Sequence, residues 1–157
     1  MTKRKNVKWV IEYAKKNPKD MFVLSGKIPA DDSYDLSYAN SLDNVKYLGY
    51  ISDEQIVALY KNCKAFIFPS IYEGFGMPPM EAMAVGAKAI VSKASCLPEV
   101  YEDTVFYIDP FDTNINLDKL LREQPVSSAE KVLNKYSWKA SAEGVYDVIG
   151  KVISKDI

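Results

Sequence analysis

The sequence has 157 residues, a length that suits one domain with a buried core. Hydrophobic residues make up 48% and charged residues 26%, as in ordinary globular proteins, and a formal net charge of −1 gives no reason to expect nucleic acid as a partner. Histidine is absent, which excludes Ser-His-Asp catalysis and the commonest zinc ligand, so acid–base chemistry would fall to carboxylates, Lys, Tyr or the substrate.

Predicted helices and strands alternate along the chain. Residues 6–17 carry apolar side chains at helical spacing, and Ser52 and Gln55 predict a capping box for the helix that follows. The segment 29–44 is predicted to be a loop with a short helix. Strands are predicted at 21–24, 45–50, 65–68, 88–91 and 105–108. Further helices are predicted at 79–85, 117–121, 129–136 and 137–153. This alternation favours a Rossmann-like, doubly wound parallel sheet.

The segment that joins the strand at 65–68 to the next helix carries the clearest chemical signal. Glu73 and Glu81 flank two glycines, Gly74 and Gly76, which permit a tight turn and a close approach of backbone N–H groups to a ligand. A pair of prolines suits the start of a helix, whose first N–H groups attract anions. A carboxylate in the first turn can accept hydrogen bonds from two ribose hydroxyls. Together these features indicate a site for a nucleotide sugar.

The run from Pro69 to Ala84 resembles the E-x7-E signature of retaining glycosyltransferase family four. Four other segments resemble landmarks of the same family in the same order: Arg4-Lys5-Asn6, Val45-Lys46-Tyr47-Leu48-Gly49-Tyr50, Leu97-Pro98-Glu99-Val100 and Tyr136-Ser137-Trp138. The similarity extends from about Arg4 to about Tyr146. It implies the two-domain GT-B architecture, and within it the C-terminal, donor-binding domain.

The resemblance also implies that parts of the family's two-domain architecture have no counterpart in this sequence. Residues 1–157 are expected to form a single nucleotide-sugar-binding domain, the C-terminal half of a GT-B architecture that lacks its first strand. The N-terminal domain of the family, which would bind the glycan or lipid-linked acceptor, has no counterpart in the sequence. We therefore expect either a fragment of a longer enzyme or one subunit of a split protein.

Functional roles follow from the resemblance, residue by residue. Glu81 would accept hydrogen bonds from the ribose, and Glu73 would be the catalytic carboxylate, orienting donor-sugar hydroxyls or stabilising positive charge. Lys5 would neutralise the diphosphate, and Tyr50 would stack on the base. Backbone N–H groups would face the sugar and the diphosphate from Gly74, Phe75, Gly76 and Met77.

Each role has a simpler alternative. Glu81 can be a carboxylate at the helix start that interacts favourably with the helix dipole and binds no ligand. Glu73 can accept hydrogen bonds from the N–H groups of its own turn. Lys5 can be a solvated lysine at a frayed terminus, and Tyr50 a half-buried residue at a strand end. The Phe75 side chain is expected in the core, and Trp138 is expected to pack the C-terminal helix against the domain.

The sequence thus predicts a retaining glycosyltransferase that moves a sugar from a nucleotide-sugar donor to a glycan or glycoconjugate, in polysaccharide biosynthesis. The alternative is a non-catalytic nucleotide-sugar-binding module or a subunit of a split transferase. The resemblance implies that no metal or other cofactor is needed, because the GT-B family generally works without a bound metal, and the sequence agrees in lacking the Asp-x-Asp pattern of metal-dependent transferases. A cytoplasmic location is expected because no long apolar run occurs. The lysine-rich first twenty residues are either a solvated face or a peripheral contact with anionic phosphate or lipid at the inner membrane face.

Overall fold

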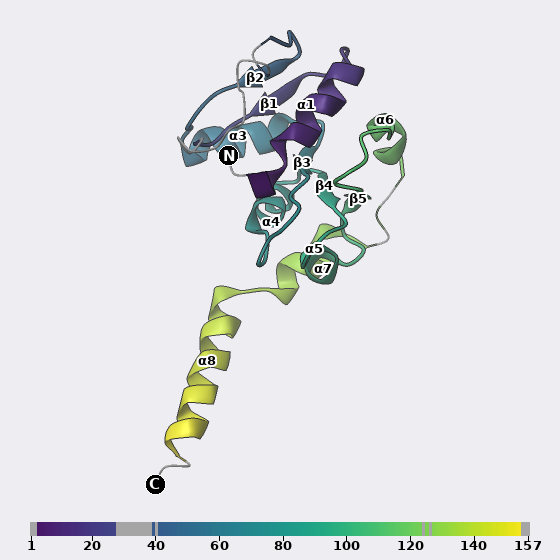
Figure 1. Cartoon of the computed structure of the whole chain (residues 1–157). Helices are drawn as coiled ribbons and strands as arrows, with labels where there is room; N and C mark the ends of the chain where they lie inside the picture. The colour runs from purple at the N-terminus through teal and green to yellow at the C-terminus, as the bar shows by residue number, and fades with distance from the viewer. Residues whose placement is uncertain (1–2, 28–38, 40, 124, 126, 155–157) are drawn as a thin grey trace.

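The computed structural model describes residues 3–27, 39, 41–123, 125 and 127–154 (Figure 1). The predicted loop and helix at 29–44 lie mostly outside the described residues. The strands are β1 (Phe22–Leu24), β2 (Val45–Tyr47), β3 (Phe66–Phe68), β4 (Ala89–Ser92) and β5 (Phe106–Ile108). The helices are η1 (Lys3–Lys5), α1 (Val7–Lys16), α3 (Asp53–Asn62), α4 (Met77–Ala84), α5 (Leu97–Tyr101), α6 (Leu117–Leu120), α7 (Ala129–Lys135) and α8 (Trp138–Ile153).

All the strand pairs that the structure describes are parallel, which confirms the predicted α/β class. β1 pairs with β2, and β3, β4 and β5 follow one another in a second sheet. Helices α3, α4 and α5 connect β2 to β3, β3 to β4 and β4 to β5, as parallel strands require. The described strands therefore form two separate sheets instead of one continuous sheet.

Two hydrophobic clusters hold these layers together. The first lies where α1 covers β1 and β2, with Trp9 and Tyr13 stacked at 5.2 Å between ring centroids. The second gathers around β4, which is buried along its whole length because it is the central strand of its sheet. The amphipathic pattern of residues 6–17 gave the buried face of α1 correctly, including Val10, Ile11 and Ala14.

The side chain of Asn44 ties the first sheet to α1. Its Nδ2 lies 3.0 Å from the Ala14 carbonyl, 3.1 Å from that of Asn17 and 3.0 Å from that of Asp20. These carbonyls belong to the end of α1 and the chain that leads to β1. The amide group therefore links the end of α1 and the chain before β1 to the residue that precedes β2.

The helix after the glycine turn begins earlier than predicted. The sequence placed it at 79–85, but α4 starts at Met77 because Gly76, with φ 82°, turns the chain into the helix. Both prolines fall in the first turn, where a missing N–H removes no helical hydrogen bond. The helix ends where predicted, since Gly86, directly after it, has φ 91° and its N–H donates to the Met83 carbonyl.

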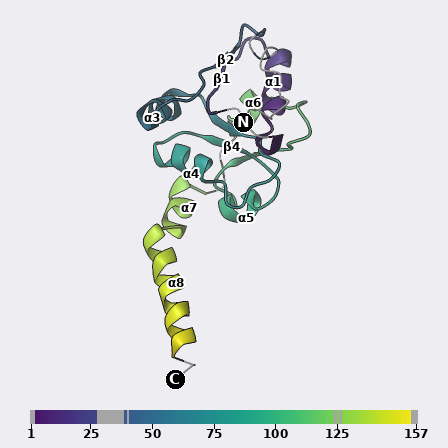
Figure 2. The same cartoon turned by 60° about the vertical axis from the view of Figure 1, so that its left-hand side comes forward.

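The last helix, α8, projects away from the rest of the chain in both views (Figures 1 and 2). Its described residues are all exposed, and Trp138 is 81% exposed, so the prediction that Trp138 packs this helix against the domain is wrong. Tyr146 and Ile149 continue the apolar side of the helix. Among the described helices, none has the length and apolar character needed to cross a membrane.

Candidate functional site

Glu73 is the centre of the candidate site. It follows β3 in the turn that leads to α4, and its side chain is only 8% exposed. One carboxylate oxygen lies 2.7 Å from Nη1 of Arg4, and the other lies 2.7 Å from Nζ of Lys5. Burial alone would raise the pKa of Glu73, but the hydrogen bond and charge of Lys5, with the contact from Arg4, outweigh it and hold that pKa below its usual value. Glu73 is therefore an ionised carboxylate at neutral pH.

Lys5 is fixed in place and is not a lysine at a frayed terminus. Besides its contact with Glu73, its Nζ lies 4.6 Å from the ring centroid of Phe68 in β3. A cation over an aromatic face is attracted by the ring as well as by the carboxylate. Both contacts keep the ammonium group at the carboxyl end of the sheet.

Arg4 is a site residue that the sequence analysis left without a role. Its Nη1 contacts the Tyr72 carbonyl at 3.4 Å as well as Glu73. The nearby Asn6 anchors the segment, since its Nδ2 donates to the carbonyls of Pro69 at 3.1 Å and Pro110 at 2.8 Å. The sequence held a signal for this arrangement, since two cations, Arg4 and Lys5, directly precede an asparagine. In the structure Asn6 has φ 52°, a conformation that asparagine tolerates well.

The backbone of Glu73 is held by the loop after β4, which the sequence analysis also missed. The Ser95 hydroxyl donates to the Glu73 carbonyl at 2.9 Å, and the Cys96 thiol lies 3.2 Å from the same oxygen. Ser95 itself has φ 53°, a strained value for a residue with a side chain. The first described turn of the chain thus fixes the side chain of Glu73, and the loop after β4 fixes its main chain.

Next to Glu73, the glycine turn leaves several backbone N–H groups without a protein acceptor among the described residues. Within the part of the chain that the structure describes, the N–H groups of Gly74, Phe75, Gly76 and Met77 have no protein acceptor. Pro78 and Pro79 have no N–H, so these four amides are the donors available where α4 begins. Such a group of amides at a helix N-terminus favours an anion.

Gly76 is required by its surroundings. A Cβ at this position would lie 2.6 Å from Cδ2 of Leu97, and its φ of 82° is unfavourable for any residue with a side chain. Gly74 differs, since a Cβ there would meet nothing within 4 Å. The Phe75 side chain packs in the core as predicted, with its ring centroid 5.0 Å from that of Tyr136.

The Tyr101 hydroxyl fixes the first turn of α4 from the neighbouring helix α5. It accepts from the Met80 N–H at 3.1 Å and donates to the Gly76 carbonyl. These are the two groups that would close the first turn of a regular α-helix. Burial and the charge of Glu81 raise the pKa of Tyr101, so the hydroxyl keeps its proton at neutral pH.

Glu81 lies in the second turn of α4, since the helix starts at Met77, and its side chain is exposed. The predicted position in the first turn is therefore wrong, and the favourable interaction with the helix dipole is weaker there. Its charge acts on Tyr60 of α3, where burial and Glu81 raise the pKa of the tyrosine to about 12. Tyr50, predicted to be half-buried or to stack on a base, is 73% exposed and has Lys27 Nζ 5.1 Å from its ring centroid.

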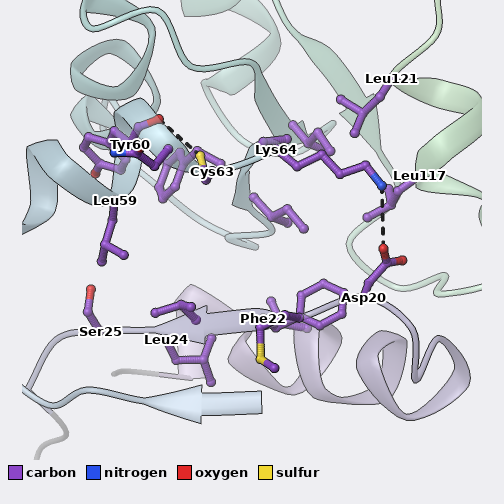
Figure 3. Close-up of a pocket in the computed structure, with 18 of the residues that line it drawn as sticks. Asp20, Phe22, Leu24, Ser25, Leu59, Tyr60, Cys63, Lys64, Leu117 and Leu121 are labelled. Atoms are coloured by element: carbon purple, nitrogen blue, oxygen red, sulfur yellow. Dashed lines mark hydrogen bonds and ion pairs between the residues drawn. The ribbon is translucent and has the colours of Figure 1, made fainter. Parts of the chain in front are cut away.

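The structure thus brings together Arg4, Lys5, Glu73 and the amides of 74–77, while Glu81 and Tyr50 are more peripheral. None of these residues lines the cavity of about 560 Å³ between β1 and α3 (Figure 3). The site is a cationic and amide-rich surface at the carboxyl edge of a parallel sheet, where α/β proteins bind their ligands.

The sequence profile of the family described as "Glycosyl transferases group 1" matches residues 1–138. The chain belongs to this family. Among curated relatives, the serotype-specific mannosyltransferase WbdA of Escherichia coli is 46% identical over 72 residues, which are 45% of this chain and 9% of that protein. O-antigen chain mannosyltransferase B of Escherichia coli is 43% identical over 70 residues, 45% of this chain and 18% of that protein.

Solved structures show the same fold in this glycosyltransferase group 1 chain. Sucrose-phosphate synthase from Thermosynechococcus elongatus matches with a TM-score of 0.78 and 22% identity, over 98% of this chain and 43% of that one. Anabaena HepE, in complex with UDP and glucose, matches with a TM-score of 0.74 and 18% identity, over 96% of this chain and 46% of that one. The chain spans less than half the length of each of these proteins. The resemblance to GT-B glycosyltransferases is therefore confirmed for family and fold, whereas the roles of the E-x7-E residues stay predictions.

Substitution of Gly76 tests the geometry of the turn. Gly76→Ala should lower the free energy of unfolding by about 2 kcal/mol or more, because the new methyl group meets Leu97 and the backbone is strained. Gly74→Ala is the matched control and should change it by less than about 0.5 kcal/mol. Urea denaturation followed by tryptophan fluorescence, to which the buried Trp9 contributes, measures both. Equal effects of the two substitutions would contradict this geometry.

The charge cluster predicts a pH dependence. The pKa of Glu73 is lower in the folded than in the unfolded chain, so its stabilisation is present above the unfolded pKa and is lost as the pH falls through the folded pKa. Glu73→Gln should therefore destabilise the protein by about 1–2 kcal/mol at pH 7 and progressively less in acid. Denaturation at pH 7 and at pH 3 measures this, with Glu12→Gln on the exposed side of α1 as the control. A difference that stays constant over this range would rule out the charged pair as its source.

Proposed function

We propose that this chain is the donor-binding domain of a retaining glycosyltransferase that takes a nucleotide sugar as its donor. The observation that carries the proposal is that Arg4 and Lys5 contact Glu73, next to the amides of 74–77, which have no protein acceptor among the described residues. Two cations and a helix N-terminus are the groups that bind a diphosphate and stabilise it as a leaving group. The complex of HepE with UDP and glucose supports a ligand of this class.

Within this proposal Glu73 acts as an ionised carboxylate. A low pKa makes it a poor general acid, and its contacts with two cations reduce its strength as a nucleophile. It is suited to orient Arg4 and Lys5, to accept hydrogen bonds from hydroxyls of the donor sugar and to stabilise positive charge as the glycosidic bond breaks. Glu81, which is exposed on α4, would accept hydrogen bonds from the ribose.

The remaining parts of the proposal concern the whole enzyme. The similarity to an O-antigen chain mannosyltransferase supports a role in polysaccharide biosynthesis and a sugar transferred to a glycan or glycoconjugate. The chemistry proposed for the site uses the two cations and the amides in place of a metal. The acceptor would be bound by the part of the transferase that these residues do not include.

Calorimetric titration with UDP, GDP, ADP and dTDP tests donor binding. One of these diphosphates should bind, and Lys5→Met should weaken it roughly ten- to a hundredfold because a charged hydrogen-bond donor is removed. Glu81→Ala should weaken nucleoside diphosphate binding but leave pyrophosphate binding unchanged, because it contacts only the ribose. Lys8→Met and Glu12→Ala, on the exposed side of α1, are the matched controls. If no diphosphate binds, or if the control variants lose as much affinity as the site variants, the assignment fails.

A second candidate function is a nucleotide-sugar-binding subunit that does not catalyse transfer by itself. The coverage of less than half of each full-length structure supports it, since half of a GT-B cleft lies outside these residues. Both candidates predict donor binding, so binding does not distinguish them. Incubation of the chain with a radiolabelled nucleotide sugar and a mannan acceptor should give no transfer. Transfer above the rate of a Glu73→Gln variant would show that the chain is a complete catalyst.

A further inference from the structure

The loop that follows β5 is bound along its length by α1 and by the residue before that helix. In the described residues, four side chains spaced three or four residues apart form hydrogen bonds with residues 109–117: Asn6, Trp9, Tyr13 and Lys16. Trp9, for example, has its Nε1 3.1 Å from the Asp109 carbonyl oxygen and 2.8 Å from that of Asp112. Because several side chains from one segment hold it, the position of this loop is fixed by the fold.

The tip of this loop presents an aromatic ring to solvent. Phe111 is 78% exposed, although its N–H donates to Oδ1 of Asp109 at 2.8 Å. Asp112 Oδ1 likewise accepts from the Asn114 N–H at 2.7 Å, so two Asx turns shape the backbone on both sides of the ring. A large apolar side chain that is exposed on a well-anchored loop contributes little to the core and is typical of a binding surface.

A second exposed aromatic residue lies on the neighbouring loop. Tyr72 follows β3 in the turn of the candidate site, and it is 67% exposed. One donor connects the two loops, since Asn6 Nδ2 lies 3.1 Å from the Pro69 carbonyl oxygen and 2.8 Å from that of Pro110. The loops after β3 and β5 therefore lie side by side at the carboxyl edge of the sheet. We call Tyr72 and Phe111 the aromatic pair.

The polar groups beside the aromatic pair favour a carbohydrate as the ligand. Asp109 and Asp112 flank Phe111, are exposed, and each carry a second carboxylate oxygen that can accept a hydrogen bond from a hydroxyl group. A sugar ring combines several hydroxyl groups with an apolar face of C–H groups, which packs against an aromatic ring. The same carboxylates would repel an anionic lipid headgroup or a phosphorylated peptide. An aromatic ring between two carboxylates therefore matches a neutral glycan better than a membrane surface.

We propose that the aromatic pair binds sugar residues of the glycan acceptor, so that part of the acceptor contact lies on this chain. Phe111 packs on the C–H face of one sugar residue, and Asp109 and Asp112 accept hydrogen bonds from its hydroxyl groups. Tyr72 contacts a sugar residue nearer to Glu73, where the proposed donor sugar lies. The inference rests on the proposed function for the role of the ligand as acceptor, and it adds a contact surface to the one expected outside these residues. Because α1 already holds the loop after β5, little free energy is lost to ordering that loop on binding.

Titration of the isotope-labelled protein with mannotetraose, followed by NMR, tests the aromatic pair. The amide signals of Tyr72 and Asp112 should shift with a dissociation constant on the order of 1 mM, because only a few side chains contact the sugar. Phe111→Ala should weaken this binding at least about fivefold, whereas Phe111→Trp, which keeps an aromatic ring, should stay within about twofold. The matched control is Tyr146→Ala on α8, since Tyr146 is also 78% exposed, and it should leave the affinity unchanged. Both alanine variants should keep the wild-type urea midpoint, because neither ring is buried.

Titration with nucleoside diphosphates separates this inference from the donor site. Phe111→Ala should leave diphosphate affinity unchanged, because Phe111 lies on the loop after β5 and not in the glycine turn. If the wild-type protein binds mannotetraose through Phe111 but binds no diphosphate, the donor site is wrong and the aromatic pair is supported. The proposal is overturned if mannotetraose at about 10 mM shifts neither amide, if Tyr146→Ala weakens binding as much as Phe111→Ala, or if Phe111→Ala weakens diphosphate binding equally. It is also overturned if phosphatidylglycerol vesicles, and not mannotetraose, bind through Phe111.

Discussion

One ion pair cluster organises the functional edge of this protein. A carboxylate that is 8% exposed loses most of its hydration, and it is tolerated only when charged partners replace the water. Glu73 meets this requirement with Arg4 and Lys5, which come from the first described turn of the chain. The need to pair this buried carboxylate therefore links segments almost seventy residues apart in sequence, because it holds η1 against the end of β3. The cations that could neutralise a diphosphate lie beside the glycine turn for the same reason.

Much of the fold could be predicted from the sequence because the periodic signals are local. The capping box of Ser52 and Gln55 is present, with the Gln55 side chain 2.9 Å from the Ser52 N–H, and the apolar runs became β1 to β5 within a few residues. The start of α4 was misplaced because Pro79 was taken as the first helical residue, whereas the left-handed turn at Gly76 starts the helix two residues earlier. The environment of Trp138 was also misjudged, since aromatic character indicates burial but does not show which surface is near.

The site was only partly predictable. Motif spacing pointed to Glu73 and the amides after it, which the structure places side by side because they are neighbours in sequence. Arg4, Ser95 and Tyr101 were missed because their contacts join segments that are distant in sequence. No periodicity or propensity encodes that Ser95 holds the Glu73 carbonyl, or that a tyrosine hydroxyl replaces a helical hydrogen bond. The same limit applied to the separation of the strands into two sheets.

The hydroxyl of Tyr101 has a consequence for ligand affinity. Since it connects the Met80 N–H to the Gly76 carbonyl from outside the helix, the first turn of α4 is tied to α5 and through it to the second hydrophobic cluster. The amides before that turn are thereby preorganised. An anion that binds them would lose little free energy to the ordering of a loop, so more of its interaction energy would appear as affinity.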